Sequence, residues 1–353
     1  MKIFRRKFGL LLLLLFCLFI GSTFKLFVQQ HHHNHESSSS LLPISNDLPS
    51  SNGKKKELSF GTFDLTIHNQ TFDYRYSSKL PLSRGSNLKS EPSIVFGILS
   101  APNNVAARQA IRASWGKEEA LFFVLGGETY TSEINLELRT FHDIVFVDAP
   151  EDYRSGLTRK TMLILHFFHH LYNENCKKDD WETSTTCYDF LFKTDDDSYV
   201  NTTQLRFELS GKDPTTGEAI AFYGEPSVKT EPDRNTSSRF YISHEEYSAK
   251  FYPPYAFGMG YALSSPLVAC VCQQMRKVRK QLPWEDVATG SLVKKCGFKL
   301  TWANWSLPGY PAKFQVQYFP YEILKPGGFS VTLVHGVKNP DWMMLLHLQK
   351  PLP

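Results

Sequence analysis

The residues best suited to chemistry are three consecutive carboxylates, Asp195, Asp196 and Asp197. They directly follow the apolar run 190–194, whose composition predicts a buried strand. In an extended chain Asp195 and Asp197 point the same way. Neighbouring carboxylates repel one another unless a cation or strong donors offset the repulsion. We therefore expect a Mn²⁺ or Mg²⁺ site, because either ion takes carboxylate and phosphate oxygens together.

Three other interpretations of this cluster are available. An EF-hand loop is excluded, because the later Asp or Asn, the central Gly and the terminal Glu do not follow Asp197 at the required spacing. A phosphatase that forms an aspartyl-phosphate also places acidic residues after a strand, so it stays open as a rival enzyme class. The third interpretation is an acidic turn, with Asn201 or Thr202 capping the next helix.

A second group of polar and aromatic residues follows later in the chain. Glu285 and Asp286 stand beside Trp284, just before a predicted helix. One of these carboxylates could accept a proton from a sugar hydroxyl as a general base, although capping of the helix is the simpler alternative. Upstream, Tyr255 and Gly258 belong to a run of aromatic, Pro and Gly residues, either a surface that stacks on sugar rings or a stiff core loop.

A pair of arginines could bind phosphate. Arg108 and Arg112 are four residues apart on the predicted helix 104–115, so they share one face. Guanidinium groups bind phosphate or carboxylate through two parallel hydrogen bonds, which suits a diphosphate at a sheet edge. Two solvent-facing charges on an amphipathic helix would give the same spacing.

The elements that position these residues alternate between apolar strands and helices, which predicts an α/β domain with a parallel sheet buried on both faces. Active sites on such sheets lie beyond the carboxyl ends of the strands. The predicted strands are 93–99, 121–125, 144–147 and 188–193. The predicted helices are 104–115, 132–140 and 158–172.

The N-terminal part predicts a membrane protein. Residues 1–7 are basic and form a predicted cytosolic tail, and the apolar segment 8–28 fits a signal anchor, with a cleaved signal peptide as the alternative. Residues 29–90 are polar and of low complexity, which predicts a luminal stem before a catalytic domain at 91–350. Residues 74–90 are the alternative start of the folded part. The formal net charge of +4 is small for 353 residues, so nothing calls for a nucleic-acid partner.

Sequons and cysteines also bear on a luminal location. Candidate N-glycosylation sites stand at Asn69, Asn201, Asn235 and Asn304. Beyond Cys17 there are five cysteines, so at least one is unpaired within the chain or pairs elsewhere. We favour a bridge between Cys176 and Cys187, which would close a polar loop. Cys270 and Cys272 lack the second pair that a zinc site needs.

Taken in order, these motifs resemble the inverting β-1,3-galactosyltransferase family (glycosyltransferase family 31), which also contains β-1,3-N-acetylglucosaminyltransferases and Fringe-like enzymes. The resemblance covers roughly residues 92–346. Its marks are the segments 108–115, 123–126, Asp143-Ile144 with Asp148, 152–160, 192–197, Tyr223-Gly224, 252–264 and 285–290.

The resemblance implies a GT-A fold: a single Rossmann-like nucleotide-binding domain with an acceptor-binding extension. It implies that Asp197 binds the metal, that Asp195 lies near the ribose or a metal-bound water, and that Asp286 is the base. His335 matches the position of a second protein ligand to the metal. The residues expected on the nucleotide-sugar side are Arg108, Arg112, Lys193, Asp195 and Asp196. Those expected around the sugar and acceptor are Tyr255, Trp284, Glu285 and Gly258.

The implied reaction is an inverting transfer of galactose from UDP-galactose to a glycan or glycoprotein acceptor in β-1,3 linkage. UDP-N-acetylglucosamine is the alternative donor, and a non-catalytic glycan-binding protein is the alternative class. We expect this protein to be a single-pass type II protein of the Golgi membrane, with the catalytic domain in the lumen. Ala288 departs from the pattern, since many relatives carry an aromatic residue there, and this bears on donor or acceptor identity.

Overall fold

The structure is a computed structural model of the 353-residue chain. It describes residues 60–67, 70–77, 91–127, 131–172, 188–210, 222–278, 280–303 and 332–348. All of these belong to one compact unit, Glu57–Pro353.

The domain is built on a mixed sheet with the strand order β1-β2-β5-β4-β3-β6-β9-β8-β10. The four central strands, β5, β4, β3 and β6, are parallel, whereas β9 is antiparallel to both β6 and β8. The strands of this sheet are β1 Phe60–Ile67, β2 Gln70–Ser77, β3 Ile94–Leu99, β4 Ala120–Gly126, β5 Ile144–Val147, β6 Phe190–Asp195, β8 Phe222–Ser227, β9 Tyr255–Ser264 and β10 Leu300–Trp302. A separate pair, β7 Ser198–Val200 and β11 Leu333–His335, is antiparallel.

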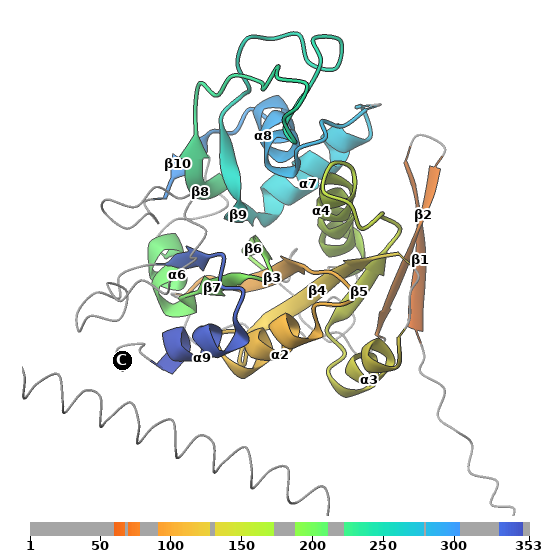
Figure 1. The fold of residues 1–353 in the computed structure, drawn as a ribbon, viewed down its shortest axis with the longest axis vertical. Helices are drawn as coiled ribbons and strands as arrows, with labels where there is room; N and C mark the ends of the chain where they lie inside the picture. Colours follow the sequence, from red (N-terminus) through yellow and green to blue (C-terminus); the bar gives the residue numbers. More distant parts are fainter. Residues whose placement is uncertain are drawn as a thin grey trace, which may run out of the picture. The chain divides into compact units, whose positions relative to one another are not determined.

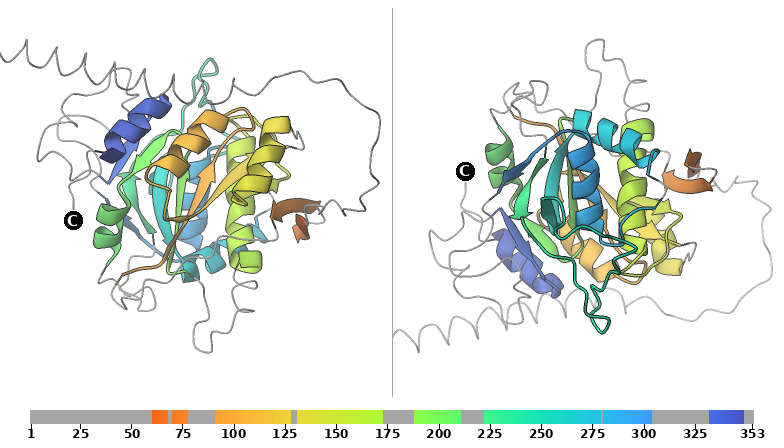
Figure 2. Two further views of the ribbon diagram at one scale, coloured as in Figure 1. Left: turned by 90° about the horizontal axis from the view of Figure 1, so that it is seen from below. Right: turned by 90° about the horizontal axis from the view of Figure 1, so that it is seen from above.

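Helices cover both faces of the sheet, as Figures 1 and 2 show. The helices that pack on one face are α4 Gly156–His166, the π-helix Phe167–Tyr172, α7 Ser265–Met275 and α8 Glu285–Lys295. Those on the other face are α2 Val105–Ala113, α3 Ser132–Thr140, α6 Thr202–Leu209 and α9 Pro340–Leu348.

The central strands are apolar throughout because both of their faces are covered. In β3, Val95 and Leu99 belong to the core under α4 and α7, whereas Phe96 and Ile98 belong to the core under α2. Successive side chains of a strand alternate between its faces, so only a continuous apolar run satisfies both cores. This arrangement brings the carboxyl ends of the parallel strands to one edge of the sheet.

The expected elements agree closely with the observed ones. The strand 144–147 and the helix 132–140 have the predicted bounds, and the remaining strands and the first helix differ by at most a few residues at either end. The predicted helix 158–172 is instead α4 followed by the π-helix Phe167–Tyr172. The mixed α/β fold, with its parallel central strands, fits the expected GT-A-like domain.

The hairpin of β1 and β2 falls within the segment that the sequence predicts as stem. β2 pairs with β5 through Tyr74↔Val147 and Tyr76↔Val145, so it extends the central sheet. The folded part therefore begins before the predicted boundary at residue 90.

Several predictions fall on residues that the structure does not describe. These are the cytosolic tail, the membrane segment 8–28, the rest of the stem, the cysteines 17, 176 and 187, and the sequons at Asn69 and Asn304. Among the described residues, no helix combines the length and apolar character that a bilayer crossing requires.

A disulfide bond joins Cys270 of α7 to Cys296, the residue that ends α8. Cys272 is buried and free. The bond joins α7 to α8, which pack on the same face of the sheet as α4. Glu285 and Asp286 belong to α8.

Candidate active site

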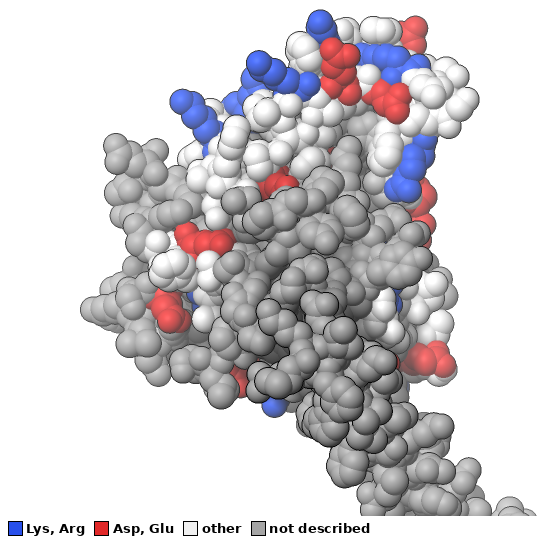
Figure 3. Space-filling model, turned by 60° about the vertical axis from the view of Figure 1, so that its left-hand side comes forward, with Lys and Arg blue, Asp and Glu red and all other residues white. Residues whose placement is uncertain are grey.

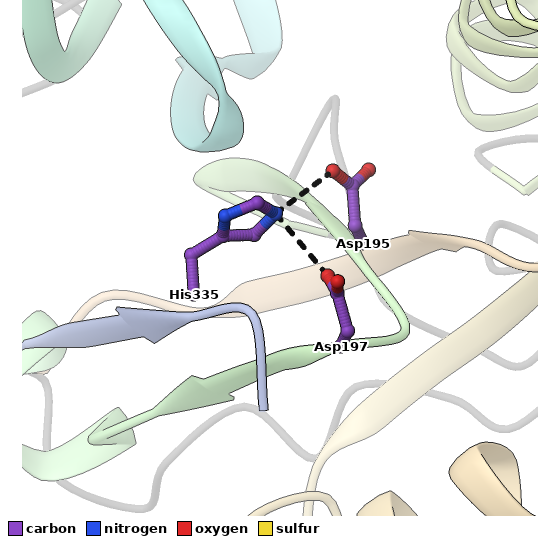
Figure 4. A group of neighbouring side chains, drawn as sticks. All are labelled: Asp195, Asp197 and His335. Atoms are coloured by element: carbon purple, nitrogen blue, oxygen red, sulfur yellow. Dashed lines mark ion pairs between the residues drawn. The ribbon is translucent and has the colours of Figure 1, made fainter. Parts of the chain in front are cut away.

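Two of the three aspartates and one histidine converge at the carboxyl end of β6. Asp195 is the last residue of β6, and Asp197 lies in the turn that leads to β7. The pairing of β11 with β7 places His335 opposite Ser198. His335 Nε2 lies 3.2 Å from Asp197 Oδ1 and 3.8 Å from Asp195 Oδ2. Figure 4 shows both carboxylates turned toward the imidazole, as expected from the spacing of Asp195 and Asp197.

This group has the ligands for a divalent metal. The ligand atoms of Asp195, Asp197 and His335 lie within 4.8 Å of one another, and all three side chains are partly exposed. Two carboxylates and one imidazole suit a metal that accepts both oxygen and nitrogen ligands, and the open side leaves room for phosphate oxygens. The described residues therefore fit the expected metal site.

The charges of this group depend on one another. Burial alone would raise the pKa of Asp197, but the hydrogen bond and the positive charge of His335 outweigh it and lower that pKa. Burial would lower the pKa of His335, whereas Asp197 and Asp195 raise it. Two carboxylates thus stabilise one cation here, and a divalent ion would take the place of the imidazolium proton.

Asp196 points away from this group. Its Oδ2 accepts hydrogen bonds from Ser100 Oγ at 2.7 Å and from Asn104 Nδ2 at 2.8 Å. These donors follow β3, the strand beside β6, so Asp196 ties two strand ends together. Burial raises the pKa of Asp196 despite these two hydrogen bonds, and the charges of Asp195 and Asp197 raise it further. Its expected role on the nucleotide side stays a prediction.

Lys193 connects the metal group to the second acidic pair. It is buried, and its Nζ donates to Asp195 Oδ1 at 2.9 Å, to Gly258 O at 2.6 Å and to Glu285 Oε2 at 3.2 Å. An ammonium has three donors, and all three are used. Lys193 thus fixes the orientation of Asp195 and offsets the charge of Glu285. Its expected place on the nucleotide side stays a prediction.

Glu285 lies beneath the site rather than on its surface. Its other oxygen accepts a hydrogen bond from the buried Tyr261 hydroxyl of β9. The pKa of Glu285 is raised, because burial outweighs the opposing effect of the Lys193 charge. A Cβ at Gly258 would lie 2.8 Å from Glu285 Oε2, so the close approach of β9 to α8 requires glycine there. Glu285 and Gly258 were predicted to line the acceptor pocket; Glu285 is buried, whereas Gly258 is partly exposed, and their part in acceptor binding stays a prediction.

Asp286 has a pKa that is shifted far from its ordinary value and falls near neutral pH. It stands in the first turn of α8 and accepts a hydrogen bond from the Val287 N–H at 2.8 Å, so the capping interpretation holds in part. Burial, followed by the charge of Glu285, raises the pKa of Asp286 to about 7. A carboxylate with a pKa near the working pH is the group that general-base catalysis needs.

Tyr255 and Trp284 pack beside this helix in a small apolar cluster with Ile242, Tyr252 and Val287. Both side chains are buried, with 7% of their surface exposed. A Cβ at Gly290 of α8 would lie 2.6 Å from Tyr255 Cβ, so this glycine allows the helix to reach β9. Stacking of Tyr255 or Trp284 on a sugar stays a prediction.

The arginine pair has a different role from the one expected. Arg108 is fully buried and donates to both oxygens of Glu137, to Ser100 Oγ and to the Ala101 and Pro102 carbonyls. Arg112 donates to Glu137 at 2.6 Å and to both oxygens of Asp143 at 2.7 Å. The prediction that these guanidinium groups bind a diphosphate is wrong, because protein carboxylates on α3 and before β5 already bind them.

We expect Glu137→Gln to lower the free energy of unfolding by about 3–5 kcal/mol, because it leaves the buried Arg108 charge without its carboxylate. Chemical denaturation followed by circular dichroism measures this loss. Glu118→Gln is the matched control, since Glu118 is exposed in the same region. Equal midpoints for the two variants would contradict a structural role for the Arg108–Glu137 pair.

Two of the candidate glycosylation sites lie in the described residues. Asn201 is buried and caps α6, because its side-chain oxygen accepts the Gln204 N–H at 3.2 Å. Because Asn201 is buried, a glycan there would disrupt the packing around it, so this fold argues against that candidate. The predicted capping of the next helix by Asn201 is confirmed. Asn235 is exposed in a turn and remains a candidate.

Comparison with known proteins identifies the family of this chain. The mixed α/β fold, the Asp–Asp–His group and the separate carboxylate are consistent with a group-transfer enzyme. The family model described as Galactosyltransferase matches residues 106–303. The chain belongs to this galactosyltransferase family, a family of glycosyltransferases.

Curated relatives share about 30% identity. They include "Beta-1,3-galactosyltransferase GALT1" of Arabidopsis thaliana, 31% identical over 210 residues that cover 56% of this chain and 30% of that protein. "UDP-GalNAc:beta-1,3-N-acetylgalactosaminyltransferase 1" of Mus spicilegus is 29% identical over 231 residues, 62% of this chain and 64% of that protein. "Beta-1,3-galactosyltransferase 5" of Homo sapiens is 28% identical over 258 residues, 69% of this chain and 76% of that protein. The chain thus matches less than two thirds of the length of the first two.

Among solved structures, a 4-diphosphocytidyl-2C-methyl-D-erythritol synthase aligns over 60% of this chain and 90% of that chain, with 10% identity and a TM-score of 0.31. A likeness this low carries no argument about function.

Proposed function

We propose that this protein is a metal-dependent, inverting β-1,3-glycosyltransferase that transfers galactose from UDP-galactose to a glycan or glycoprotein. The observation that carries the proposal is the separation of two acidic groups on one sheet edge. Asp195, Asp197 and His335 form an open metal-ligand group, and Asp286 is a partly exposed carboxylate with a pKa of about 7. Lys193 joins the two groups through Asp195 and Glu285.

The reaction uses these residues in a single displacement. Asp286 accepts the proton of an acceptor hydroxyl, whose oxygen forms a bond to C1 of the sugar as the bond from C1 to the UDP oxygen breaks. A divalent cation on Asp195, Asp197 and His335 would offset the charge of the diphosphate as it leaves. Because attack and departure occur on opposite faces of C1, an α-linked donor gives a β-linked product.

The donor follows from the family rather than from the site. Two of the relatives above are named galactosyltransferases and one is named for UDP-GalNAc, so UDP-N-acetylgalactosamine joins UDP-N-acetylglucosamine as an alternative donor. The test is incubation of the full-length protein, in mild detergent, with Mn²⁺, a glycan acceptor and each UDP-sugar in turn. We expect release of UDP and an acceptor lengthened by one galactose with UDP-galactose, and UDP release with none of the donors would end the proposal.

The acidity of Asp286 predicts the pH dependence of transfer. A general base works only when deprotonated, so kcat/KM should rise about tenfold per pH unit below a pH of about 7 and level off above it. Initial rates at saturating Mn²⁺ between pH 5 and 9 measure this profile. A rate that is flat from pH 5 to 8 would contradict Asp286 as the base.

We also propose a Golgi membrane location, with a single N-terminal span and the catalytic domain in the lumen. The apolar segment 8–28 after the basic tail supports the span. The Cys270–Cys296 disulfide supports an oxidising compartment. A protease that digests the catalytic domain in intact microsomes would contradict this orientation.

A further inference from the structure

Exposed aromatic rings and an arginine form a surface beside the start of α8. Phe240 contacts Trp284 with ring centroids 5.7 Å apart and Tyr153 with centroids 6.1 Å apart. Arg239 lies over both outer rings, its Cζ 4.1 Å from the Tyr153 centroid and 4.9 Å from that of Phe240. We call Tyr153, Arg239, Phe240 and Trp284 the Arg239 platform. Tyr153 is 49% exposed and Phe240 is 45% exposed, so the platform faces solvent.

The platform is held by a network of hydrogen bonds. Arg154 donates to the Tyr241 carbonyl at 2.7 Å and pairs with Glu246, and its guanidinium lies over the Trp284 ring. Arg234 donates to the Ile242, Ser243 and Tyr247 carbonyls. These contacts fix the loop around residue 240 against the segment after β5, so the two exposed rings are ordered before any ligand arrives. A preorganised surface loses little conformational entropy on binding.

Arg239 has no acidic partner among the described residues. Its guanidinium stacks on two aromatic rings and forms no hydrogen bond or ion pair with the described residues, whereas Arg154, on the same surface, is paired with Glu246. A stacked guanidinium keeps its N–H edge free, and that edge matches the two oxygens of a carboxylate. On the face drawn in Figure 3, Lys and Arg lie among Asp and Glu across the upper part of the described surface. Beside the platform, Arg154 and Lys280 both pair with Glu246, so recognition at Arg239 would depend on this one fixed cation.

The position of the platform relates it to the acceptor. Trp284 immediately precedes α8, and Asp286, the proposed base, is two residues further on. The rings of Tyr153 and Phe240 extend this surface from Trp284 out to solvent. An acceptor whose reacting hydroxyl reaches Asp286 could place a neighbouring sugar on the platform, with its ring on the aromatic faces.

We propose that the Arg239 platform is an acceptor subsite for a sugar that bears a carboxylate, such as a uronic acid residue. This rests on the proposed function only in treating the bound glycan as the acceptor. The carboxylate lies against the free edge of the Arg239 guanidinium, and the sugar ring stacks on Tyr153 or Phe240.

The test measures glycan binding directly, so it does not depend on turnover. The full-length protein is titrated by calorimetry with a glucuronic acid-containing disaccharide and with its neutral glucose-containing counterpart; a sulfated disaccharide separates carboxylate from anions in general. We expect the acidic sugar to bind more tightly than the other two. Arg239→Gln should weaken its binding about tenfold or more, as loss of a charged hydrogen bond does, and leave the neutral sugar within about twofold. Arg239→Lys should restore only part of the loss, because it keeps the charge without the planar fork.

Lys250→Gln is the matched control. Lys250 is an exposed cation over the Phe251 ring in the same loop region, and its loss changes the net charge equally. Melting temperatures of all variants verify folding. Equal affinity of the wild type for acidic and neutral sugars, or an equal loss in Lys250→Gln and Arg239→Gln, would overturn the subsite. Tight binding of the acidic sugar without UDP release from any donor would defeat the proposed function and leave the subsite standing.

Discussion

Asp286→Asn should reduce sugar transfer by about 100-fold to 10,000-fold, the range that loss of a general base produces. Asparagine has nearly the same shape and can still accept the Val287 N–H bond, but it cannot take a proton from the acceptor hydroxyl. Binding of UDP with Mn²⁺ should stay within about twofold of the wild type, because Asp195, Asp197 and His335 are unchanged. Initial-rate kinetics and calorimetry measure the two quantities, and turnover close to the wild-type rate would remove Asp286 from the mechanism.

The same variant should be more stable than the wild type above neutral pH. The folded-state pKa of Asp286 is about 7 and its ordinary value is 3.8, so the unfolded chain releases this proton more readily. The carboxylate therefore costs nothing below pH 3.8, destabilises the fold increasingly as pH rises from 3.8 to about 7, and leaves a constant cost above that. At pH 8, Asp286→Asn should raise the free energy of unfolding by up to about 4 kcal/mol. A variant that loses activity while gaining stability excludes misfolding as the cause.

Local patterns were sufficient to predict most of the fold. Continuous apolar runs such as 94–99 and 120–126 predict strands covered on both faces, and their burial confirms it. The helix 158–172 was predicted as uninterrupted because its apolar periodicity continues through Phe167, where the structure changes to a π-helix. The hairpin at 60–77 was missed because its pairing with β5 is a contact across some 70 residues of sequence.

Predictions about the site succeeded where the chain itself fixes geometry. The side chains of Asp195 and Asp197 point the same way because the two residues are separated by one residue of extended chain. His335 lies beside them, as the resemblance implied. Arg108 and Arg112 were misassigned because their spacing is the same for a phosphate site and for a buried ion pair. The deciding residue, Glu137, lies 29 positions after Arg108 on another helix. Asp143, beside a predicted strand, was the one available signal that a carboxylate would lie nearby.

Lys193 and Tyr261 illustrate the same limit. Both stand within the motifs that carry the family resemblance, yet neither pattern indicates that they meet Glu285. Their contacts depend on the antiparallel pairing of β6 with β9, which sets Lys193 opposite Tyr261, and on the packing of α8 over both strands. Such a buried network follows from tertiary structure, so it becomes visible only once the sheet order is known.

Asp197→Asn should raise the Mn²⁺ concentration needed for half-maximal UDP binding by roughly 100-fold or more, since loss of even an outer partner of a metal ligand typically costs 10–100-fold. Asp196→Asn is the matched control, because it is the same chemical change at the preceding residue. The Asp196 carboxylate accepts hydrogen bonds from Ser100 and Asn104 and lies outside the Asp–Asp–His group. Titration of Mn²⁺ at fixed UDP, followed by calorimetry, separates the two. The ligand assignment requires a large shift for position 197 and a small one for position 196. Equal shifts would mean that the triplet acts through its total charge, and an unshifted Asp197→Asn curve would place the metal elsewhere.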